Sequence, residues 1–241
     1  MPMASSTALT LRFLLEQALP VEEYTCRVIA IAHRENDVED KLVAATAQLL
    51  SVEQDVIRQG IERLLQVDRL VRETLAGITV VYLPRLHEAE RYCAERLLQF
   101  AREGFPEPRG LEKMIRRVAQ ESGITYSAQQ EQAIREAAYS GVLLITGGPG
   151  TGKTTILNGI LELLGQMQLK CLLAAPTGRA AKRLTEVTGE DASTIHRLLE
   201  AGIDPATGKM VFLRDESNPL KADVVIVDEM SMVDVLLLHS L

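Results

Sequence analysis

Gly147-Gly148-Pro149-Gly150-Thr151-Gly152-Lys153-Thr154 is the stretch of sequence on which the fold assignment depends. It matches the pattern G-x-x-x-x-G-K-[ST] at every fixed position. Glycines allow such a loop to curl so that backbone N–H groups point inward at phosphate oxygens. An apolar run, 142–145, precedes the loop, and an apolar-striped helix predicted over 153–165 follows it. The stretch therefore predicts a phosphate-binding loop between a buried strand and a helix, rather than a chance glycine-rich turn.

A pair of acids supplies the second half of a nucleotide site. Asp228 and Glu229 follow the apolar run 224–227, which predicts a buried strand ending in two carboxylates. Parallel sheets bind ligands at the carboxyl ends of their strands, so we expect this pair beside the loop. Lys153 would reach the β- and γ-phosphates, Thr154 and Asp228 would hold Mg²⁺, and Glu229 would activate the attacking water. The pattern predicts an enzyme that hydrolyses a nucleoside triphosphate.

The region around these motifs has the order of a parallel α/β sheet. Continuous apolar runs of strand length alternate with stretches of helical periodicity, which is typical of strands covered on both faces. We expect strands at 142–145, 170–174 and 223–227, helices at 127–140, 153–165, 178–187 and 194–200, and a turn at 204–209.

The N-terminal region reads as helices followed by a hairpin. We expect helices around 9–18, 24–33, 38–50 and 53–66, then strands at 70–73 and 78–83 around Gly77. Ser51 and Gln54 form a capping-box pattern at the start of the fourth helix. This order resembles a winged helix. The helix at 53–66 mixes arginines with acids, so a domain that positions the nucleotide site or binds protein is favoured over one that grips DNA.

A segment rich in proline and glycine, 103–110, marks the clearest linker. Pro84 fits the first position of a helix running to about 103, and a bridging helix at 111–121 ends at Gly123. We therefore expect a winged-helix-like accessory domain at 1–83, linking helices at 84–124 and an α/β domain at 125–241.

The bulk composition is that of an ordinary globular protein, with 46% hydrophobic and 24% charged residues. A net charge of −7 disfavours a protein that coats nucleic acid through bulk charge, but it is compatible with a local basic groove. We expect neither a membrane span nor a signal peptide. Cys26, Cys93 and Cys171 are scattered singly, which favours small buried side chains in a reducing cytoplasm.

The segments around the phosphate loop resemble those of the RecD-like branch of superfamily 1 helicases. Ser127-Ala128-Gln129-Gln130-Glu131-Gln132-Ala133-Ile134 is similar to that family's glutamine motif, and Asp228-Glu229-Met230-Ser231-Met232-Val233-Asp234 to its acid motif. The resemblance implies a RecA-like P-loop sheet and ATP as the nucleotide. It places Gln130 on the adenine and, for the rest of the cofactor site, implies Gly147, Gly148, Pro149, Gly150, Thr151, Gly152, Lys153, Thr154 and Thr155.

Two further segments resemble the parts with which the family grips single-stranded DNA. The first begins Ala175-Pro176-Thr177-Gly178-Arg179 and the second is Ser193-Thr194-Ile195-His196-Arg197-Leu198-Leu199. The resemblance implies DNA contacts by Pro176, Thr177, Gly178, Arg179 and His196. From the residues alone, Thr177 caps a strand–helix connection and His196 stabilises a turn, and these interpretations stay open.

Members of this family carry a second motor domain whose arginine reaches the γ-phosphate. The sequence ends at Leu241, soon after the acid motif, so we expect a fragment with an incomplete first sheet that lacks this partner domain. Loss of an arginine finger costs about 10³–10⁵ in rate. We therefore expect binding of ATP–Mg²⁺ and single-stranded DNA, very slow hydrolysis and no unwinding by these residues alone.

The resemblance favours an ATP-dependent, 5′-to-3′ DNA helicase as the parent activity. One alternative is a P-loop ATPase that acts on something other than DNA, with segment 175–184 only capping a helix. Another is a nucleotide-gated DNA-binding module without helicase activity.

Overall fold

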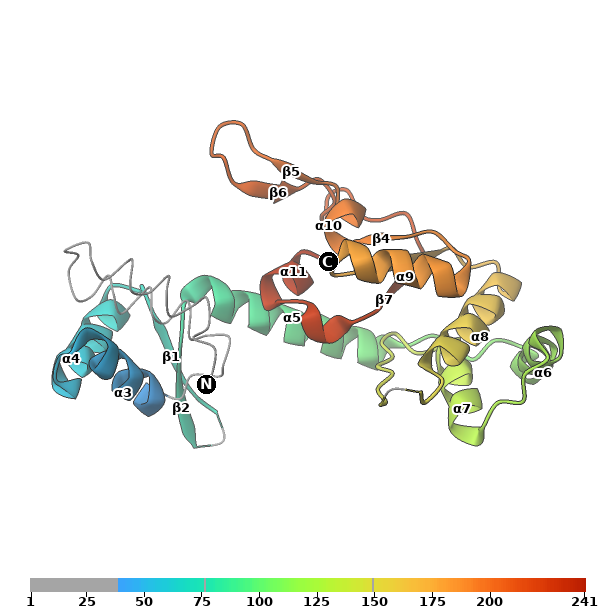
Figure 1. The fold of residues 1–241 in the computed structure, drawn as a ribbon, viewed down its shortest axis with the longest axis horizontal. Helices are drawn as coiled ribbons and strands as arrows, with labels where there is room; N and C mark the ends of the chain where they lie inside the picture. The colour runs from blue at the N-terminus through green and yellow to red at the C-terminus, as the bar shows by residue number, and fades with distance from the viewer. Residues whose placement is uncertain (1–38, 76, 149) are drawn as a thin grey trace, which may run out of the picture. The chain divides into compact units, whose positions relative to one another are not determined.

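A computed structural model describes residues 39–241 except 76 and 149, so the helices expected around 9–18 and 24–33 lie outside the described residues. The chain divides into two compact units, one ending at Arg91 and the other covering Tyr92–Leu241 (Figure 1). Within the described ranges, no helix combines the length and apolar character needed to cross a bilayer.

The first unit is a helical pair with a hairpin, as the sequence predicts. It consists of α3 (Glu39–Leu50), α4 (Gln54–Gln66), β1 (Val71–Leu75), β2 (Ile78–Tyr82) and the first part of α5 (Pro84–Glu103). The hairpin is antiparallel and pairs Val71 with Tyr82. Its core is apolar and includes Leu42, Val43, Ile57, Ile61, Leu64 and Val81. The helix stripes that predicted these elements are the faces that the unit buries.

The capping box predicted at Ser51 is wrong. Ser51 adopts a left-handed backbone with φ of 55°, and Val52 N donates to Ala47 O at 3.1 Å. This geometry closes the C-terminal end of α3. Helix α4 begins after Glu53, which makes no side-chain cap. The two helices are so close in sequence that a serine suited to starting one instead terminates the other.

Two arginines of the first unit, Arg58 and Arg72, pair with acids of the same unit. Arg72 donates to Glu39 at 2.7 and 2.8 Å and to Glu62 at 2.6 Å, and these hydrogen bonds raise the pKa of Arg72, with the bond to Glu62 contributing most. Arg58 on α4 lies 3.7 Å from Asp40. Cations paired in this way are less available to phosphates, which agrees with the mixed charge read from the sequence.

The second unit holds a parallel sheet in the order β4-β3-β7. The strands are β3 (Cys171–Ala175), β4 (Ala192–Thr194) and β7 (Val224–Val227), and the register pairs Ala175 with Thr194 and Ala174 with Val227. The helices are α6 (Leu111–Ser122), α7 (Ala128–Glu136), α8 (Lys153–Gln166), α9 (Gly178–Thr188), α10 (Ile195–Leu198) and α11 (Val235–Ser240), with the 3-10 turn η2 (Met230–Met232). The α/β prediction is confirmed.

The two faces of the sheet pack into separate cores. Ile226 and Val224 face a cluster built by α6, α7 and α8, which includes Ile156, Ile160 and Leu163. Ala174 and Val227 face a second cluster. Its other members are Ile195, Leu198, Leu199, Phe212, Leu220, Val233 and Leu237. Both faces of the sheet therefore carry apolar cores, as the continuous apolar runs predict, although Val225 on β7 is 39% exposed.

The strand predicted at 142–145 is not formed. Its side chains alternate as a strand's would, with Ile145 packed on the α8 cluster and Leu144 75% exposed. The sheet order is β4-β3-β7, and none of the described strands pairs with this segment. A strand needs a ladder partner, and the apolar run 142–145 has none among the described strands.

A hairpin was missed by the sequence analysis, which expected only a turn at 204–209. Strands β5 (Ala201–Ile203) and β6 (Met210–Phe212) pair antiparallel and project from the rest of the second unit (Figure 1). Asp204 holds the turn by accepting from Ala206 N at 2.9 Å and from the Thr207 hydroxyl at 2.6 Å. The strands are too short to give an apolar alternation that sequence reading could recognise.

Cys93 and Cys171, the cysteines within the described ranges, form no disulfide with each other. Cys93 is buried, as expected, and Cys171 is half-buried. Burial is the main reason that the pKa of Cys171 is raised, which keeps this thiol protonated.

Close approach of α7 to α8 depends on Gly159. A Cβ added there would lie 2.6 Å from Ile134 Cδ1 and 2.9 Å from the Tyr126 hydroxyl. We expect Gly159→Ala to destabilise the second unit by about 1–3 kcal/mol, because overpacking outweighs the gain in helix propensity. Gly165, also on α8, is the matched control, since a Cβ there meets nothing within 4 Å.

Urea unfolding followed by circular dichroism measures both variants. Gly165→Ala should leave the free energy of unfolding unchanged or raise it by up to about 1 kcal/mol. Equal effects of the two substitutions would contradict the close contact between the helices.

Candidate nucleotide and nucleic-acid site

The parallel sheet brings three of the predicted motifs to one edge. Strand β3 ends at Ala175 and leads to Thr177, β4 ends at Thr194 and leads to His196, and β7 ends at Val227 and leads to Asp228. The register places these ends side by side, because Ala174 pairs with Val227 and Ala175 with Thr194. Segments separated by many residues therefore meet at the carboxyl edge, where ligands bind in open α/β sheets.

The acid pair leaves β7 through a strained backbone. Asp228 N donates to Ala174 O at 3.0 Å, which extends the ladder by one residue, and Asp228 Oδ1 accepts from Glu229 N at 2.9 Å. Glu229 adopts a left-handed conformation with φ of 54°. A left-handed residue that is not glycine costs on the order of 1 kcal/mol and often marks a functional site. Asp228 is exposed and Glu229 half-buried, so both carboxylates can meet a ligand.

The phosphate loop is folded around its own lysine. Lys153 Nζ donates to Gly147 O at 2.5 Å and to Gly148 O at 2.8 Å. The Thr151 hydroxyl also donates to Gly148 O, at 2.9 Å. Glycines at positive φ, Gly150 at 75° and Gly152 at 83°, give the chain this curl. Phosphate oxygens are better acceptors for an ammonium group than these carbonyls are, so a nucleotide would replace them.

The loop ends at the start of α8, where Lys153, Thr154 and Thr155 form the first turn. The first backbone N–H groups of a helix have no partner within it, and together with the helix dipole they favour an anion. The Thr154 hydroxyl is exposed in this turn. Pro149, which the sequence placed in the cofactor site, lies outside the described residues.

Gln130 lies against the loop from the first turn of α7. A Cβ added at Gly152 would lie 2.5 Å from Gln130 Nε2, so the amide nitrogen faces the end of the loop. The other end of the amide caps the helix, since Oε1 accepts from Ser127 N at 3.0 Å. The glutamine motif is thus also a capping box, with Ser127 Oγ accepting from Gln130 N at 3.3 Å. The amide that the sequence assigns to adenine sits next to the phosphate cradle.

The two residues that the sequence assigned to Mg²⁺ carry oxygen donors of the kind this ion prefers. Thr154 offers a hydroxyl and Asp228 a carboxylate, and Mg²⁺ binds through one or two protein oxygens together with water and phosphates. The described ranges hold no group of three or more His, Cys, Asp and Glu side chains that could bind a metal without a nucleotide. In the same ranges neither acid is hydrogen-bonded to the loop.

Thr177 and its neighbours open α9 at the same edge. Thr177 Oγ1 accepts from Ala180 N at 3.2 Å and so caps the helix, as the residues alone suggested. Pro176 is half-buried, while Gly178 and Arg179 are exposed. Arg179 makes no ion pair within the part of the chain that the structure describes. An open helix start with an exposed arginine beside it is a suitable contact for a phosphate.

His196 packs on the hairpin. It is half-buried, and its ring lies 5.9 Å from the ring of Phe212 on β6. Thr194 caps the short helix by accepting from Arg197 N at 3.1 Å. In this geometry His196 stabilises the base of the hairpin.

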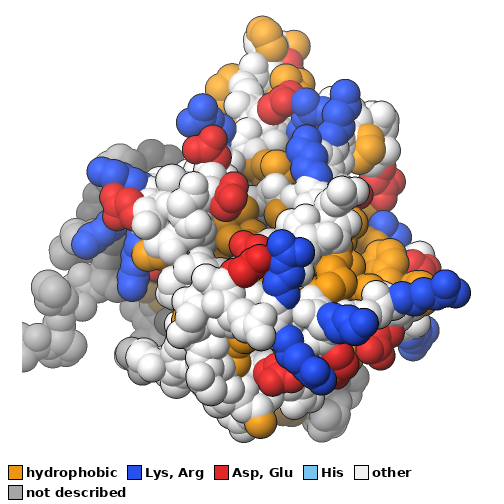
Figure 2. All heavy atoms as spheres, turned by 90° about the vertical axis from the view of Figure 1, so that its right-hand side faces the viewer, with side chains coloured by type: hydrophobic (Ala, Val, Ile, Leu, Met, Phe, Trp, Pro, Cys, Tyr) orange, Lys and Arg blue, Asp and Glu red, His pale blue; other side chains and the backbone are white. Residues whose placement is uncertain are grey.

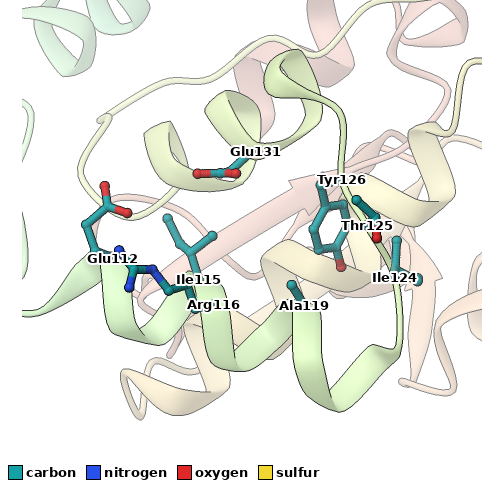
Figure 3. A pocket seen from close by; sticks show the side chains of 8 residues that line it. All are labelled: Glu112, Ile115, Arg116, Ala119, Ile124, Thr125, Tyr126 and Glu131. Carbon is teal, nitrogen blue, oxygen red and sulfur yellow. The ribbon is translucent and has the colours of Figure 1, made fainter.

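A pocket of about 380 Å³ lies between α6 and α7 (Figure 3). Its lining residues are Glu112, Ile115, Arg116, Ala119, Ile124, Thr125, Tyr126 and Glu131. None of them is a residue that the sequence assigned to a site, although Glu131 adjoins Gln130. Arg135 pairs with both Glu112 and Glu131, and its hydrogen bond is the main reason that the pKa of Glu112 is lowered.

Charges on the face shown in Figure 2 are mixed. Basic and acidic side chains lie side by side there, without a patch of one sign. This face therefore offers no extended surface of positive charge to nucleic acid.

A glycine loop that folds around its lysine, a helix that starts from it and a strand-borne acid pair define a P-loop nucleotide-binding domain. The sequence profile of the family described as "AAA domain" matches residues 130–241. Together with the relatives below, these features support a RecD-like superfamily 1 helicase.

Three relatives illustrate this similarity. The "ATP-dependent RecD2 DNA helicase" of Deinococcus radiodurans is 35% identical over 161 residues, covering 67% of this chain and 21% of the relative. The "RecBCD enzyme subunit RecD" of Mycobacterium tuberculosis is 32% identical over 228 residues, or 85% and 35% of the two chains. The "ATP-dependent DNA helicase dda" of Enterobacteria phage T4 is 40% identical over 107 residues, or 43% and 24%. The chain thus spans about a fifth to a third of the length of these relatives.

The contact between Gln130 and the loop predicts different outcomes for two glycines. Gly152→Ala would place a Cβ on Gln130 Nε2 at a residue with φ of 83°, so we expect the loop and the first turn of α7 to rearrange. Gly148→Ala meets nothing within 4 Å and should not disturb α7. Amide chemical shifts measure this, and unchanged Ser127–Gln130 signals in Gly152→Ala would contradict the contact.

Proposed function

We propose that this chain binds ATP–Mg²⁺ and single-stranded DNA as the first motor domain of an ATP-dependent DNA helicase. The observation that carries the proposal is the shared carboxyl edge of β3, β4 and β7, which brings the acid pair and the Thr177 segment together. Nucleotide and DNA would then be bound by adjacent strands of one sheet, so that a change at one could reach the other. The proposed direction of movement, 5′ to 3′, is supported by the family resemblance.

Each predicted residue would have a distinct task. Lys153 would exchange its two loop carbonyls for the β- and γ-phosphates, and Gln130 would present its amide to the adenine. Thr154 and Asp228 would hold Mg²⁺, which when bound neutralises charge on the phosphate oxygens. Glu229 would accept a proton from the water that attacks the γ-phosphate.

Hydrolysis by these 241 residues alone should be slow. Among the described residues no arginine is hydrogen-bonded to the loop, and an arginine finger contributes about 10³–10⁵ in rate. A normal, DNA-stimulated turnover in this chain would contradict the proposed division of labour between two motor domains.

Two substitutions test the nucleotide site: one should weaken nucleotide binding, and the other should slow hydrolysis without weakening binding. Lys153→Ala should weaken binding of a fluorescent ATP analogue at least about tenfold, because it removes a charge-assisted contact. Glu229→Gln should bind within about twofold of the unaltered chain while single-turnover hydrolysis falls about 10²–10⁴-fold.

Glu190 is an exposed acid between α9 and β4. Glu190→Gln is the matched control and should change neither the binding of the analogue nor the rate of hydrolysis. Tight binding by Lys153→Ala, or unimpaired hydrolysis by Glu229→Gln, would refute the assigned roles.

The DNA contact is tested at the start of α9. Thr177→Ala combined with Arg179→Ala should weaken binding of single-stranded DNA at least about tenfold and reduce its salt dependence, because each phosphate contact contributes a slope of about 0.7. Fluorescence anisotropy at several salt concentrations measures both.

Lys182→Ala is the control for loss of positive charge, since Lys182 is on the same helix and lies 3.9 Å from Glu186. Equal losses in the control and the double variant would indicate bulk charge alone. Absence of DNA binding by the unaltered chain would favour the P-loop ATPase that acts on another partner.

A further inference from the structure

Tyr92 is the residue at which three segments distant in sequence meet. From α5, its hydroxyl donates to Glu216 Oε1 at 2.6 Å. Its ring lies 4.8 Å from the ring of His239 on α11. The next residue, Cys93, is buried and donates from Sγ to Val235 O at 3.9 Å, also on α11. One turn of α5 thus contacts both the helix that follows the acid motif and the segment that follows the β5–β6 hairpin.

The route from the acid pair to α11 is short and hydrogen-bonded. Glu229 O accepts from Met232 N at 2.9 Å, and Met230 O accepts from Val233 N at 3.1 Å. Asp234 then caps α11 by accepting from Leu237 N at 2.9 Å. A change in the left-handed backbone at Glu229 would therefore move α11, because the connection between them is short and held by hydrogen bonds.

The segment between the hairpin and Glu216 is also held by hydrogen bonds. Leu213 N and Arg214 N both donate to Leu199 O, at 3.1 and 3.2 Å. The Arg214 guanidinium donates to Glu200 at 2.6 Å. Asp215 accepts from Ser217 and Asn218, and these bonds, the Ser217 hydroxyl first, lower the pKa of Asp215. The segment 213–218 and the base of the hairpin therefore form one piece.

The two routes also share a hydrophobic core. Phe212 at the end of β6, Val227 before the acid pair and Leu237 on α11 belong to the same cluster. Tyr92 adds a polar tie outside this core. A 2.6 Å hydrogen bond from a hydroxyl to a carboxylate is stronger than one between neutral groups.

We propose that Tyr92 is a positioning residue that couples the acid motif to the β5–β6 hairpin. Binding of ATP–Mg²⁺ at Asp228 and Glu229 shifts α11, and the tie through Tyr92 to Glu216 transmits this shift to the base of the hairpin. The inference rests on the proposed nucleotide binding. It states that the hairpin changes its position or mobility when the nucleotide binds.

Two observations support the coupling, one at the hairpin and one at Tyr92. Its apolar side chains are open to a partner, with Ile203 66% and Met210 56% exposed. The pKa of Tyr92 is raised, chiefly by the hydrogen bond to Glu216, so the phenol stays protonated and donates at neutral pH. A change in the hairpin's position or mobility would alter what those exposed side chains touch.

Hydrogen exchange of hairpin peptides, with and without Mg²⁺ and a non-hydrolysable ATP analogue, tests the coupling in the 241-residue chain. In the unaltered chain we expect the analogue to change hairpin exchange at least about threefold. In Tyr92→Phe, which keeps the ring beside His239, the response should fall below about 1.5-fold while the analogue binds within about twofold. Tyr139→Phe is the control, because the Tyr139 hydroxyl makes no hydrogen bond within the described residues.

Glu216 provides a second arm that does not alter α5. Glu216→Ala should abolish the hairpin response, whereas Glu216→Gln retains an acceptor oxygen and should preserve much of it. Such rescue by the conservative change is not expected from a generally loosened loop.

The outcomes separate the two proposals. A hairpin response in Tyr92→Phe and Glu216→Ala equal to that of the unaltered chain overturns the coupling. So does an unaltered chain that binds the analogue without any hairpin response, and this result leaves the nucleotide proposal intact. Failure of the unaltered chain to bind the analogue would overturn both.

Discussion

Parallel pairing of β3 with β7 is the interaction on which the rest of the site depends. Each strand is short, and each is closely followed by a polar residue that could bind a ligand: Thr177 after β3 and Asp228 after β7. Pairing Ala174 with Val227 aligns these two exits, and the hydrogen bond from Asp228 N to Ala174 O extends the alignment into the acid pair. A register slip of one residue would turn Val227 away from its core and move the acids off the edge.

The phosphate loop reaches this sheet by packing rather than by pairing. Helix α8 carries the loop at its start and covers the face of β7 that presents Val224 and Ile226. Gly159 lets α7 approach α8 closely enough for Gln130 to lie against Gly152. The helices α7 and α8 thus hold the amide and the cradle together, and their common core fixes the distance between them. This arrangement also explains why an unpaired segment at 142–145 can precede an ordered helix.

The hairpin and α11 extend the site beyond the residues that would touch a ligand. Both are joined to the acid motif through the core that contains Phe212 and Leu237. Tyr92 on α5 then contacts His239 on α11 and Glu216 in the segment that follows the hairpin. A hydrogen bond couples two segments because it requires a narrow range of distances and angles, whereas an apolar core tolerates small shifts.

The sequence by itself determined the phosphate loop, the acid pair and the alternation of strands and helices, because these depend on spacing and periodicity within short windows. It also predicted the end of α6 at Gly123, since a glycine suits the left-handed cap. Tertiary structure alone decided whether each apolar run became a strand: 224–227 found a ladder partner and 142–145 did not. It decided that Ser51 ends a helix, that His196 packs on a hairpin and that Tyr92 joins two distant segments. These outcomes depend on which neighbours arrive in space, and no local pattern of side chains records that.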